Sequence, residues 1–244
     1  KPKGRGQAVL PSPVEVFATQ KKIHFHSAIS INTPESFEIL KKAKPDVILV
    51  AAFGQLLKEN ILSLPTYGCL NVHGSLLPKY RGAAPIQWAI YNGEKETGIT
   101  IQRMVKKLDA GDIFVQEKQS ILDSDNSATV FQKLSKLGGV ALLKALQKLE
   151  KKELDFTPQK ESEATFAPKI EKAQGELNWE RPSMNLFNQI RAFNPWPVCE
   201  TILGKEALKI YEAVPAESSD KKPGTIVTDG KTLKVVCGDQ KLLS

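Results

Sequence analysis

A continuous apolar run at residues 47–53 constrains the fold of this chain most strongly. A run this short, with no alternation of polar residues, is typical of a strand covered on both faces. A short helix is expected around residues 58–63, and a second apolar run begins at Cys69. Strands that alternate with helices predict an α/β protein with a doubly wound, mostly parallel sheet.

The expected helices and strands divide the rest of the chain into a mixed helix-and-strand part and a β-rich part. Helices are expected over 11–20, 85–91 and 128–151, and another begins at Thr33-Pro34, with Thr33 as its cap. Further strands are expected within 22–31 and over 97–104 and 112–119. After a polar connector at 157–175, a helix at 183–192 precedes short β-like runs at 201–203, 208–212, 224–227 and 233–236, a pattern typical of a small β-barrel. We therefore predict a first domain over 1–166, a linker over 167–176 and a second domain over 177–244.

Two polar side chains interrupt the apolar run that begins at Cys69. Asn71 and His73 are two residues apart, so they share one face at the end of the expected strand. Asp109 lies in a tight turn, Leu108-Asp109-Ala110-Gly111-Asp112, that opens another apolar run. In open α/β sheets ligands bind beyond such strand ends. An amide, an imidazole and a carboxylate that converge there suit acyl or formyl transfer without a metal or a covalent intermediate.

These motifs resemble those of the formyltransferases that use 10-formyltetrahydrofolate. The resemblance rests on Asn71 to Pro78, Arg81 to Ile90, Glu96 to Thr100 and Leu108 to Asp112. Three further segments, Lys3 to Gly6, Pro11 to Val14 and Ile190 to Pro197, resemble the members of that family that formylate methionyl-tRNA. The resemblance covers nearly the whole chain. It also implies a first strand unit before Lys1 and further strands after Ser244, so the chain is expected to be incomplete at both ends.

The resemblance implies roles for particular residues and a type of fold. It implies a Rossmann-like catalytic domain, an OB-like C-terminal domain that binds tRNA, and 10-formyltetrahydrofolate as cosubstrate. The implied catalytic residues are Asn71, His73 and Asp109; the implied folate contacts are Ser75, Leu76, Leu77 and Pro78; and the implied tRNA contacts are Lys3 and Arg5. Gly54 and Gln55 follow the run at 47–53, so they are candidates to line the same crevice or to serve structure only.

The chemistry gives each catalytic candidate a role. The Asn71 amide can donate to the formyl oxygen as negative charge develops there. His73 can exchange protons near neutrality or, when protonated, donate to the oxyanion, and Asp109 can hold the imidazole or an ordered water. The sequence does not decide between these roles for His73. Arg81 is open between supporting the loop and facing an anionic substrate.

Composition restricts the classes of partner. The net charge of +7 suits a polyanionic partner such as tRNA, and no apolar run is long enough to span a membrane. Three scattered cysteines indicate neither a disulfide framework nor a zinc site, and a reducing compartment such as the cytoplasm or an organelle matrix is expected. His24 and His26 lack further ligands nearby, so no metal is expected. A monomer is expected.

Two alternatives stay open at this point. One is a formyltransferase of the same family that acts on a sugar amine or on glycinamide ribonucleotide. The other is a non-catalytic RNA-binding module that uses the basic C-terminal part. The trio of Asn71, His73 and Asp109 argues against the second alternative, because binding alone does not need it.

Overall fold

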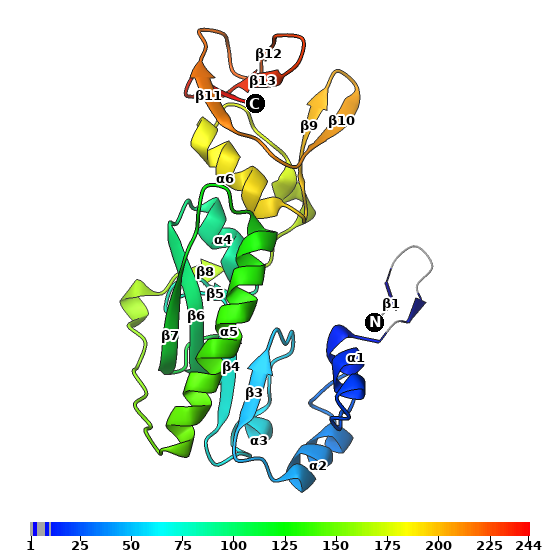
Figure 1. Ribbon diagram of the computed structural model, residues 1–244, viewed down its shortest axis with the longest axis vertical. Helices are drawn as coiled ribbons and strands as arrows, with labels where there is room; N and C mark the ends of the chain where they lie inside the picture. Colours follow the sequence, from blue (N-terminus) through cyan, green and yellow to red (C-terminus); the bar gives the residue numbers. More distant parts are fainter. Residues whose placement is uncertain (1, 4–7, 10) are drawn as a thin grey trace.

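A four-stranded sheet forms the centre of the first half of the molecule. The computed structural model describes residues 2–3, 8–9 and 11–244. The strands of this sheet lie in the order β3 (Ile48–Ala51), β4 (Cys69–His73), β6 (Glu96–Arg103) and β7 (Ile113–Ser120) (Figure 1). The α/β class is confirmed. The prediction of a mostly parallel sheet needs correction for the described strands, because β3–β4 is parallel whereas β4–β6 and β6–β7 are antiparallel. The connection from β6 to β7 is too short for the crossover that a parallel pair requires.

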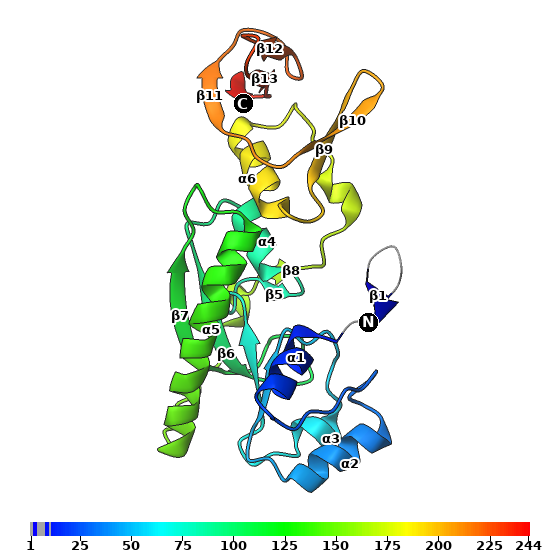
Figure 2. The ribbon, with the colours of Figure 1, turned by 45° about the vertical axis from the view of Figure 1, so that its right-hand side comes forward.

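Helix α5 (Ser127–Glu150) lies along one face of this sheet (Figures 1 and 2). It begins at the predicted place because the Asn126 side chain accepts a hydrogen bond from the Thr129 N–H at 3.0 Å. Its inward positions include Val130, Leu134 and Ala141, all at most 2% exposed. Gly138 allows close packing, since a Cβ there would lie 3.3 Å from the side chain of Val72 on β4.

The N-terminal elements lie on the side of β3, the edge strand of the sheet, and the β1–β2 hairpin is the farthest of them from the sheet (Figure 1). They are β1 (Pro2–Lys3), β2 (Ala8–Val9), α1 (Pro13–Gln20), α2 (Pro34–Ala43) and α3 (Glu59–Leu62). Thr33 caps α2 as predicted, with its hydroxyl oxygen 3.2 Å from the Ser36 nitrogen. The strand predicted within residues 22–31 is wrong: this segment has no described strand partner, and Ile23 and Phe25 are exposed. An extended segment becomes a strand only when a neighbour takes up its backbone hydrogen bonds.

The segment predicted as a polar connector and linker packs against both halves of the chain: its first part contacts the first half, and the Gln174 and Glu176 carbonyls accept hydrogen bonds from the Gln189 amide in the C-terminal part. It contains the 3-10 turns η1 (Glu161–Glu163) and η2 (Lys172–Gly175), and the strand β8 (Phe166–Ala167) pairs in parallel with β5 (Arg81–Gly82). Ala167 and Ile170 are 0% and 2% exposed. The proposed division into two domains stays a prediction.

The C-terminal part joins the rest through two helices. Helix α6 (Ser183–Phe193) packs on α4 (Pro85–Tyr91), where the rings of Phe193 and Tyr91 stack at 5.6 Å. Beyond α6 the described strands form two antiparallel sheets, the hairpin β9–β10 and a sheet in the order β11-β14-β13-β12 (Figure 2). Their bounds are β9 (Cys199–Leu203), β10 (Glu206–Ile210), β11 (Pro215–Ser218), β12 (Ile226–Thr228), β13 (Leu233–Val236) and β14 (Lys241–Leu243). The four predicted β-like runs correspond to β9, β10, β12 and β13; closure into an OB-like barrel stays a prediction.

Candidate active site

The face of the sheet opposite α5 is polar at the end of β4. Leu70 and Val72 alternate with Asn71 and His73, and Val72 faces α5 through its contact with Gly138. On the neighbouring strand β6, Asn71 lies opposite Gln102 and His73 lies opposite Thr100. The predicted pair therefore lies on one polar face, as the alternation requires.

The imidazole of His73 is held between a backbone carbonyl and a carboxylate. Its Nε2 lies 2.9 Å from the carbonyl oxygen of Tyr80, and its Nδ1 lies 3.7 Å from Oδ2 of Asp109. A carbonyl oxygen only accepts hydrogen bonds, so Nε2 carries a hydrogen, and in the neutral ring Nδ1 is the basic nitrogen. His73 is only 5% exposed. The proton-accepting atom of the ring therefore faces Asp109.

Two donors fix the carboxylate of Asp109. The N–H of Gly82 donates to Oδ2 and the Gln102 amide donates to Oδ1, both at 2.9 Å. Asp109 has φ 46°, a left-handed conformation that costs most L-residues about 1–2 kcal/mol and that Asp tolerates better than most. Position 82 requires glycine, because φ is 126° and a Cβ would lie 2.5 Å from the carbonyl oxygen of Ala167.

The Asn71 amide is the member of the trio that remains available to a ligand. Asn71 is half-buried, and its side chain makes no hydrogen bond to any other residue that the structure describes. It lies across from Gln102, which itself contacts Asp109. The structure thus brings His73 and Asp109 together directly and places Asn71 opposite Gln102, which binds Asp109.

The expected folate loop at residues 75–78 is anchored to β6 and β7. Thr100 Oγ1 donates to the Ser75 carbonyl at 2.6 Å and accepts from the Leu77 N–H at 3.1 Å. Gln116 on β7 donates to the Leu77 carbonyl at 2.8 Å. The Ser75 hydroxyl is satisfied within the loop, by the Lys79 carbonyl at 2.6 Å. Ser75 and Leu77 are buried, whereas the Leu76 and Pro78 side chains are half-buried and offer more surface to a ligand.

The two candidates after β3 behave differently from each other. Gln55 uses its amide on the chain itself: it donates to the Ile29 carbonyl at 3.0 Å and accepts from the Ile31 N–H at 3.1 Å. Gly54 is exposed, and a Cβ there would meet nothing within 4 Å. The structure therefore gives Gln55 a structural contact and leaves the backbone at Gly54 open.

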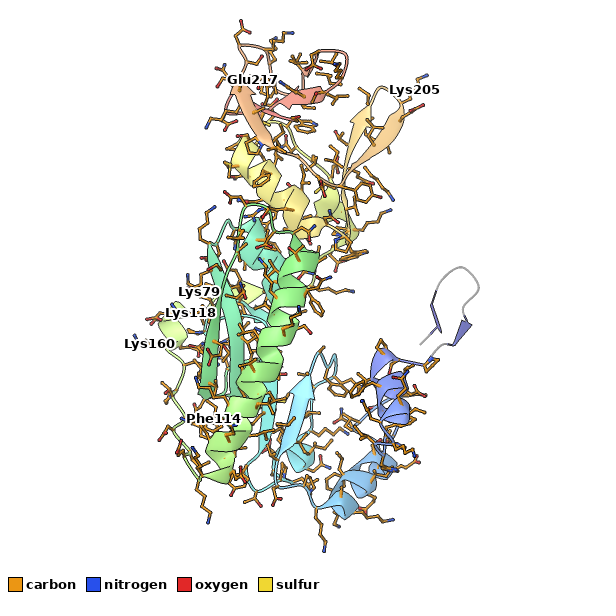
Figure 3. All side chains as sticks on the ribbon, in the orientation of Figure 1. Lys79, Phe114, Lys118, Lys160, Lys205 and Glu217 are labelled. Carbon is orange, nitrogen blue, oxygen red and sulfur yellow. The ribbon has the colours of Figure 1, made fainter. Side chains whose placement is uncertain are left out.

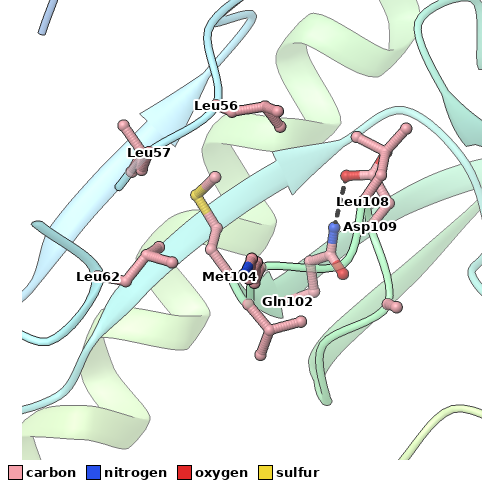
Figure 4. A pocket seen from close by; sticks show the side chains of 10 residues that line it. Leu56, Leu57, Leu62, Gln102, Met104, Leu108 and Asp109 are labelled. Carbon is pink, nitrogen blue, oxygen red and sulfur yellow. Dashed lines mark hydrogen bonds between the residues drawn. The ribbon is translucent and has the colours of Figure 1, made fainter. Parts of the chain in front are cut away.

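A small cavity of about 40 Å³ lies directly beside Asp109 (Figure 4). Its polar side is formed by Gln102 and Asp109, and apolar side chains line the rest of it from the loop after β3, from α3 and from the loop between β6 and β7. These are Leu56, Leu57, Leu62, Met104 and Leu108. Typical ligand pockets measure about 300–1,000 Å³, so a larger ligand must widen this cavity or lie across its mouth. Of these apolar residues only Leu108 belongs to a motif predicted from the sequence; for the others the available signal was the apolar Leu56-Leu57 pair that follows Gln55.

Arg81 supports the loops of the site. It is 0% exposed, and its guanidinium donates to Gln159 and to both carboxylate oxygens of Glu161, the shortest at 2.7 Å. Arg81, together with Lys107, lowers the pKa of Glu161 to about 2. This settles the alternative left open by the sequence in favour of loop support.

The remaining predictions concern binding. Lys3 lies in β1, and Arg5 lies outside the described residues, so the predicted tRNA contacts are untested. Among the residues that the structure describes, there is no group of three or more His, Cys, Asp or Glu side chains that could hold a metal ion. No helix in the described part of the chain is long and apolar enough to cross a membrane.

Comparison with known proteins decides the family. Residues 1–146 match the formyl transferase family, and residues 169–244 match the formyl transferase C-terminal domain. The chain belongs to the formyl transferase family. The resemblance seen in the sequence is thereby confirmed, as are the α/β fold and the class of enzyme.

Similar sequences carry a more specific name. A methionyl-tRNA formyltransferase from Caldanaerobacter subterraneus subsp. tengcongensis is 45% identical over 244 residues, which cover 99% of this chain and 79% of that protein. One from Listeria monocytogenes serotype 4b is 41% identical over 100% of this chain and 78% of that protein. Among solved structures, the N-formyltransferase from Helicobacter canadensis in complex with folinic acid and dTDP-3-aminofucose matches with a TM-score of 0.74 and 18% identity, over 96% of this chain and 83% of that chain. At that identity the likeness shows the fold alone.

Proposed function

We propose that this protein transfers the formyl group of 10-formyltetrahydrofolate to the free amino group of methionyl-tRNA, which gives formylmethionyl-tRNA for translation initiation. The observation that carries the proposal is the arrangement of His73 and Asp109, with 3.7 Å between Nδ1 and Oδ2, at the end of a strand that also bears Asn71. The relatives named methionyl-tRNA formyltransferase, at 41–45% identity over nearly the whole chain, support the choice of acceptor.

The reaction forms one carbon–nitrogen bond and breaks another. The amine attacks the formyl carbon, the carbonyl oxygen gains negative charge, and the bond from that carbon to N10 of the folate breaks. The amine loses a proton and N10 gains one. Each of these events needs a group at a defined place, and the site has one for each.

The neutral His73 ring can accept the proton at Nδ1, because Nε2 already carries the hydrogen that binds the Tyr80 carbonyl. The imidazolium that results lies 3.7 Å from the Asp109 carboxylate, which stabilises it until the proton passes to N10. The Asn71 amide can donate to the developing oxyanion. Loss of one such donor typically lowers the rate by about 10²–10³.

The folate is proposed to lie over the loop at 75–78 and the mouth of the cavity beside Asp109. Leu76, Pro78 and the open backbone at Gly54 offer surface for its flat ring, and Leu56, Met104 and Leu108 line the cavity behind it. The hydrogen bonds from Thr100 and Gln116 hold the loop in place before the cosubstrate arrives.

The tRNA is proposed to contact the segment with Lys3 and Arg5 and the exposed lysines of the C-terminal part. Figure 3 shows Lys205 at the outer tip of the β9–β10 hairpin. Further exposed lysines of this part are Lys209, Lys221, Lys222, Lys231 and Lys241. A spread of exposed ammonium groups suits a phosphate backbone better than a small acceptor.

A comparison of acceptors tests the proposal. The purified protein is given 10-formyltetrahydrofolate with methionyl-tRNA, with a dTDP-linked amino sugar or with glycinamide ribonucleotide, and the formylated product is measured. We expect formylation of methionyl-tRNA at a rate at least about 100-fold above the others, since acceptor discrimination of that order is normal when a site is built for one of them. Faster formylation of the sugar or of glycinamide ribonucleotide would replace the proposed acceptor, and tRNA binding without any transfer would indicate the RNA-binding alternative.

A further inference from the structure

The turn that carries Asp109 is braced by a residue from outside both family segments. Gln159 lies between residue 146, where the first match ends, and residue 169, where the second begins. Its amide nitrogen donates to the carbonyl oxygens of Asp109 at 2.8 Å and Gly111 at 2.7 Å, and it lies 3.3 Å from Oε1 of Gln102. One side chain therefore binds the backbone on both sides of Ala110.

Arg81 determines which end of the Gln159 amide faces the turn. The guanidinium donates to Gln159 Oε1 through Nε at 3.0 Å and through Nη2 at 2.8 Å. A guanidinium has no acceptor, so the amide oxygen must face Arg81 and the amide nitrogen must face the two carbonyls. Glu161 holds the other side of the same buried guanidinium.

The turn cannot hold this shape well by its own backbone. Asp109 has φ 46°, and the backbone hydrogen bond that closes the turn, from the Ala110 N–H to the Lys107 carbonyl, is long at 3.4 Å. The two short hydrogen bonds from the Gln159 amide nitrogen hold the backbone of the turn, which its own long hydrogen bond holds only weakly. Any relaxation of φ at Asp109 would rotate its carboxylate away from the Gly82 N–H and from His73.

We propose that Gln159, oriented by Arg81, is a positioning residue for formyl transfer: it holds the backbone of Asp109 so that the carboxylate faces His73. Gln159 does not contact the reacting atoms. The inference rests on the proposed function, because it assigns Gln159 its role through Asp109.

The sharpest variant is Gln159→Glu. It keeps the shape of the side chain and an oxygen acceptor for Arg81, but it replaces the donating nitrogen with an oxygen that would face the carbonyls of Asp109 and Gly111. The matched control is Gln147→Glu, an identical exchange at an exposed position of α5. A second variant, Gln159→Met, removes the hydrogen bonds without adding a charge and covers the case in which the glutamate variant folds poorly.

We expect kcat to fall by about 10- to 100-fold in both Gln159 variants with KM for both substrates changed less than about threefold, since small misplacements of catalytic groups cost rates of this order. In an Asp109→Asn background the Gln159→Glu exchange should cost less than about threefold, because residues that act through one another are not additive. The NMR signal of the His73 imidazole should move in Gln159→Glu as it moves in Asp109→Asn, and Gln147→Glu should leave it in place.

Three results would overturn the inference. These are a kcat within twofold of the unmodified protein, a rise in KM that accounts for the whole effect, and an undiminished effect in the Asp109→Asn background. If the unmodified protein transfers no formyl group to any acceptor, the proposed function fails instead. The His73 signal still tests the position of Asp109 in that case, since it requires no turnover.

Discussion

Replacement of Asp109 by Asn tests the electrostatic part of the site most directly. The exchange removes the negative charge and keeps the size of the side chain. Oδ2 lies 3.7 Å from Nδ1 of His73, and both side chains are nearly buried, at 6% exposed for His73 and 11% for Asp109. At this distance two unit charges attract by about 4–5 kcal/mol at an effective dielectric constant of about 20, and by about 1 kcal/mol in bulk water.

The expected loss of rate follows from this range of interaction energies. The charge matters only when the imidazole is protonated, so its loss raises the barrier and leaves substrate binding nearly unchanged. With about 1.36 kcal/mol for each factor of ten, the expected loss is about fivefold to two thousandfold, and we expect a value near 100-fold. The variant also turns an amide donor toward the Gly82 N–H or toward Gln102, which leaves one hydrogen bond unmade and costs about 1 kcal/mol of stability.

The assay is single-turnover formylation of methionyl-tRNA at saturating 10-formyltetrahydrofolate, with thermal unfolding measured on the same samples. Asp112→Asn is the matched control, because Asp112 lies in the same turn and its side chain makes no hydrogen bond or ion pair with the described residues. We expect the control to react within about twofold of the unmodified protein. An Asp109→Asn protein that folds and keeps more than half of the normal rate would refute the electrostatic role.

Three further predictions concern the supporting loops and the tRNA. Arg81 and Lys107 lower the pKa of Glu161 to about 2, so this carboxylate stabilises the fold fully above about pH 4.5 and loses that effect as the pH falls toward 2. The melting temperature of Glu161→Gln should therefore lie furthest below that of the unmodified protein near neutrality, and the difference should vanish in acid. A difference that does not change with pH would contradict this. Gly111→Ala should lower activity and lower stability by about 1–3 kcal/mol, because a Cβ there would lie 1.7 Å from the Arg103 carbonyl oxygen. Gly139→Ala, on the open side of α5, should instead stabilise the protein by about 0.5–1 kcal/mol, and calorimetry distinguishes the two variants. Arg5→Ala should weaken the use of methionyl-tRNA and flatten the dependence of its affinity on salt, with folate binding unchanged; weaker folate binding with normal use of tRNA would assign this segment to the cosubstrate.

The sequence predicts the parts of the site that depend on local periodicity. Asn71 and His73 share a face because side chains alternate along a strand, and Asp109 stands out because a Leu-Asp-Ala-Gly turn opens an apolar run. The same local logic located α2, α5 and α6. It could not give strand directions, because the choice between parallel and antiparallel pairing depends on how the connections run in space.

Contacts between distant segments account for what the sequence did not show. Gln159 lies 50 residues from Asp109, in a polar stretch that has the composition of a connector. The residues at 22–31 have the composition of a strand, but no described strand lies beside them to pair with. In the first case the missing information is which residue lies beside the turn, in the second it is whether any strand lies beside the segment, and single-sequence patterns carry no signal for either.

Strand β6 explains why the two loops of the site keep a fixed spacing. Its residues Ile99 and Ile101 are buried on the α5 side, and Thr100 and Gln102, at 0% and 1% exposed, point to the polar face. Thr100 holds the 75–78 loop through the Ser75 carbonyl, and Gln102 holds the Asp109 carboxylate, one alternation further along the strand. Neighbouring positions on one face of a strand are about 7 Å apart. This single strand therefore fixes the distance between the Asp109 carboxylate and the loop that is proposed to bind the folate. The Thr100 hydroxyl also accepts from Gln116 at 3.0 Å, and the Gln102 amide oxygen also accepts from Gln159 at 3.3 Å. A change at either residue would therefore break the hydrogen bonds that hold one of the two loops and displace that part of the site.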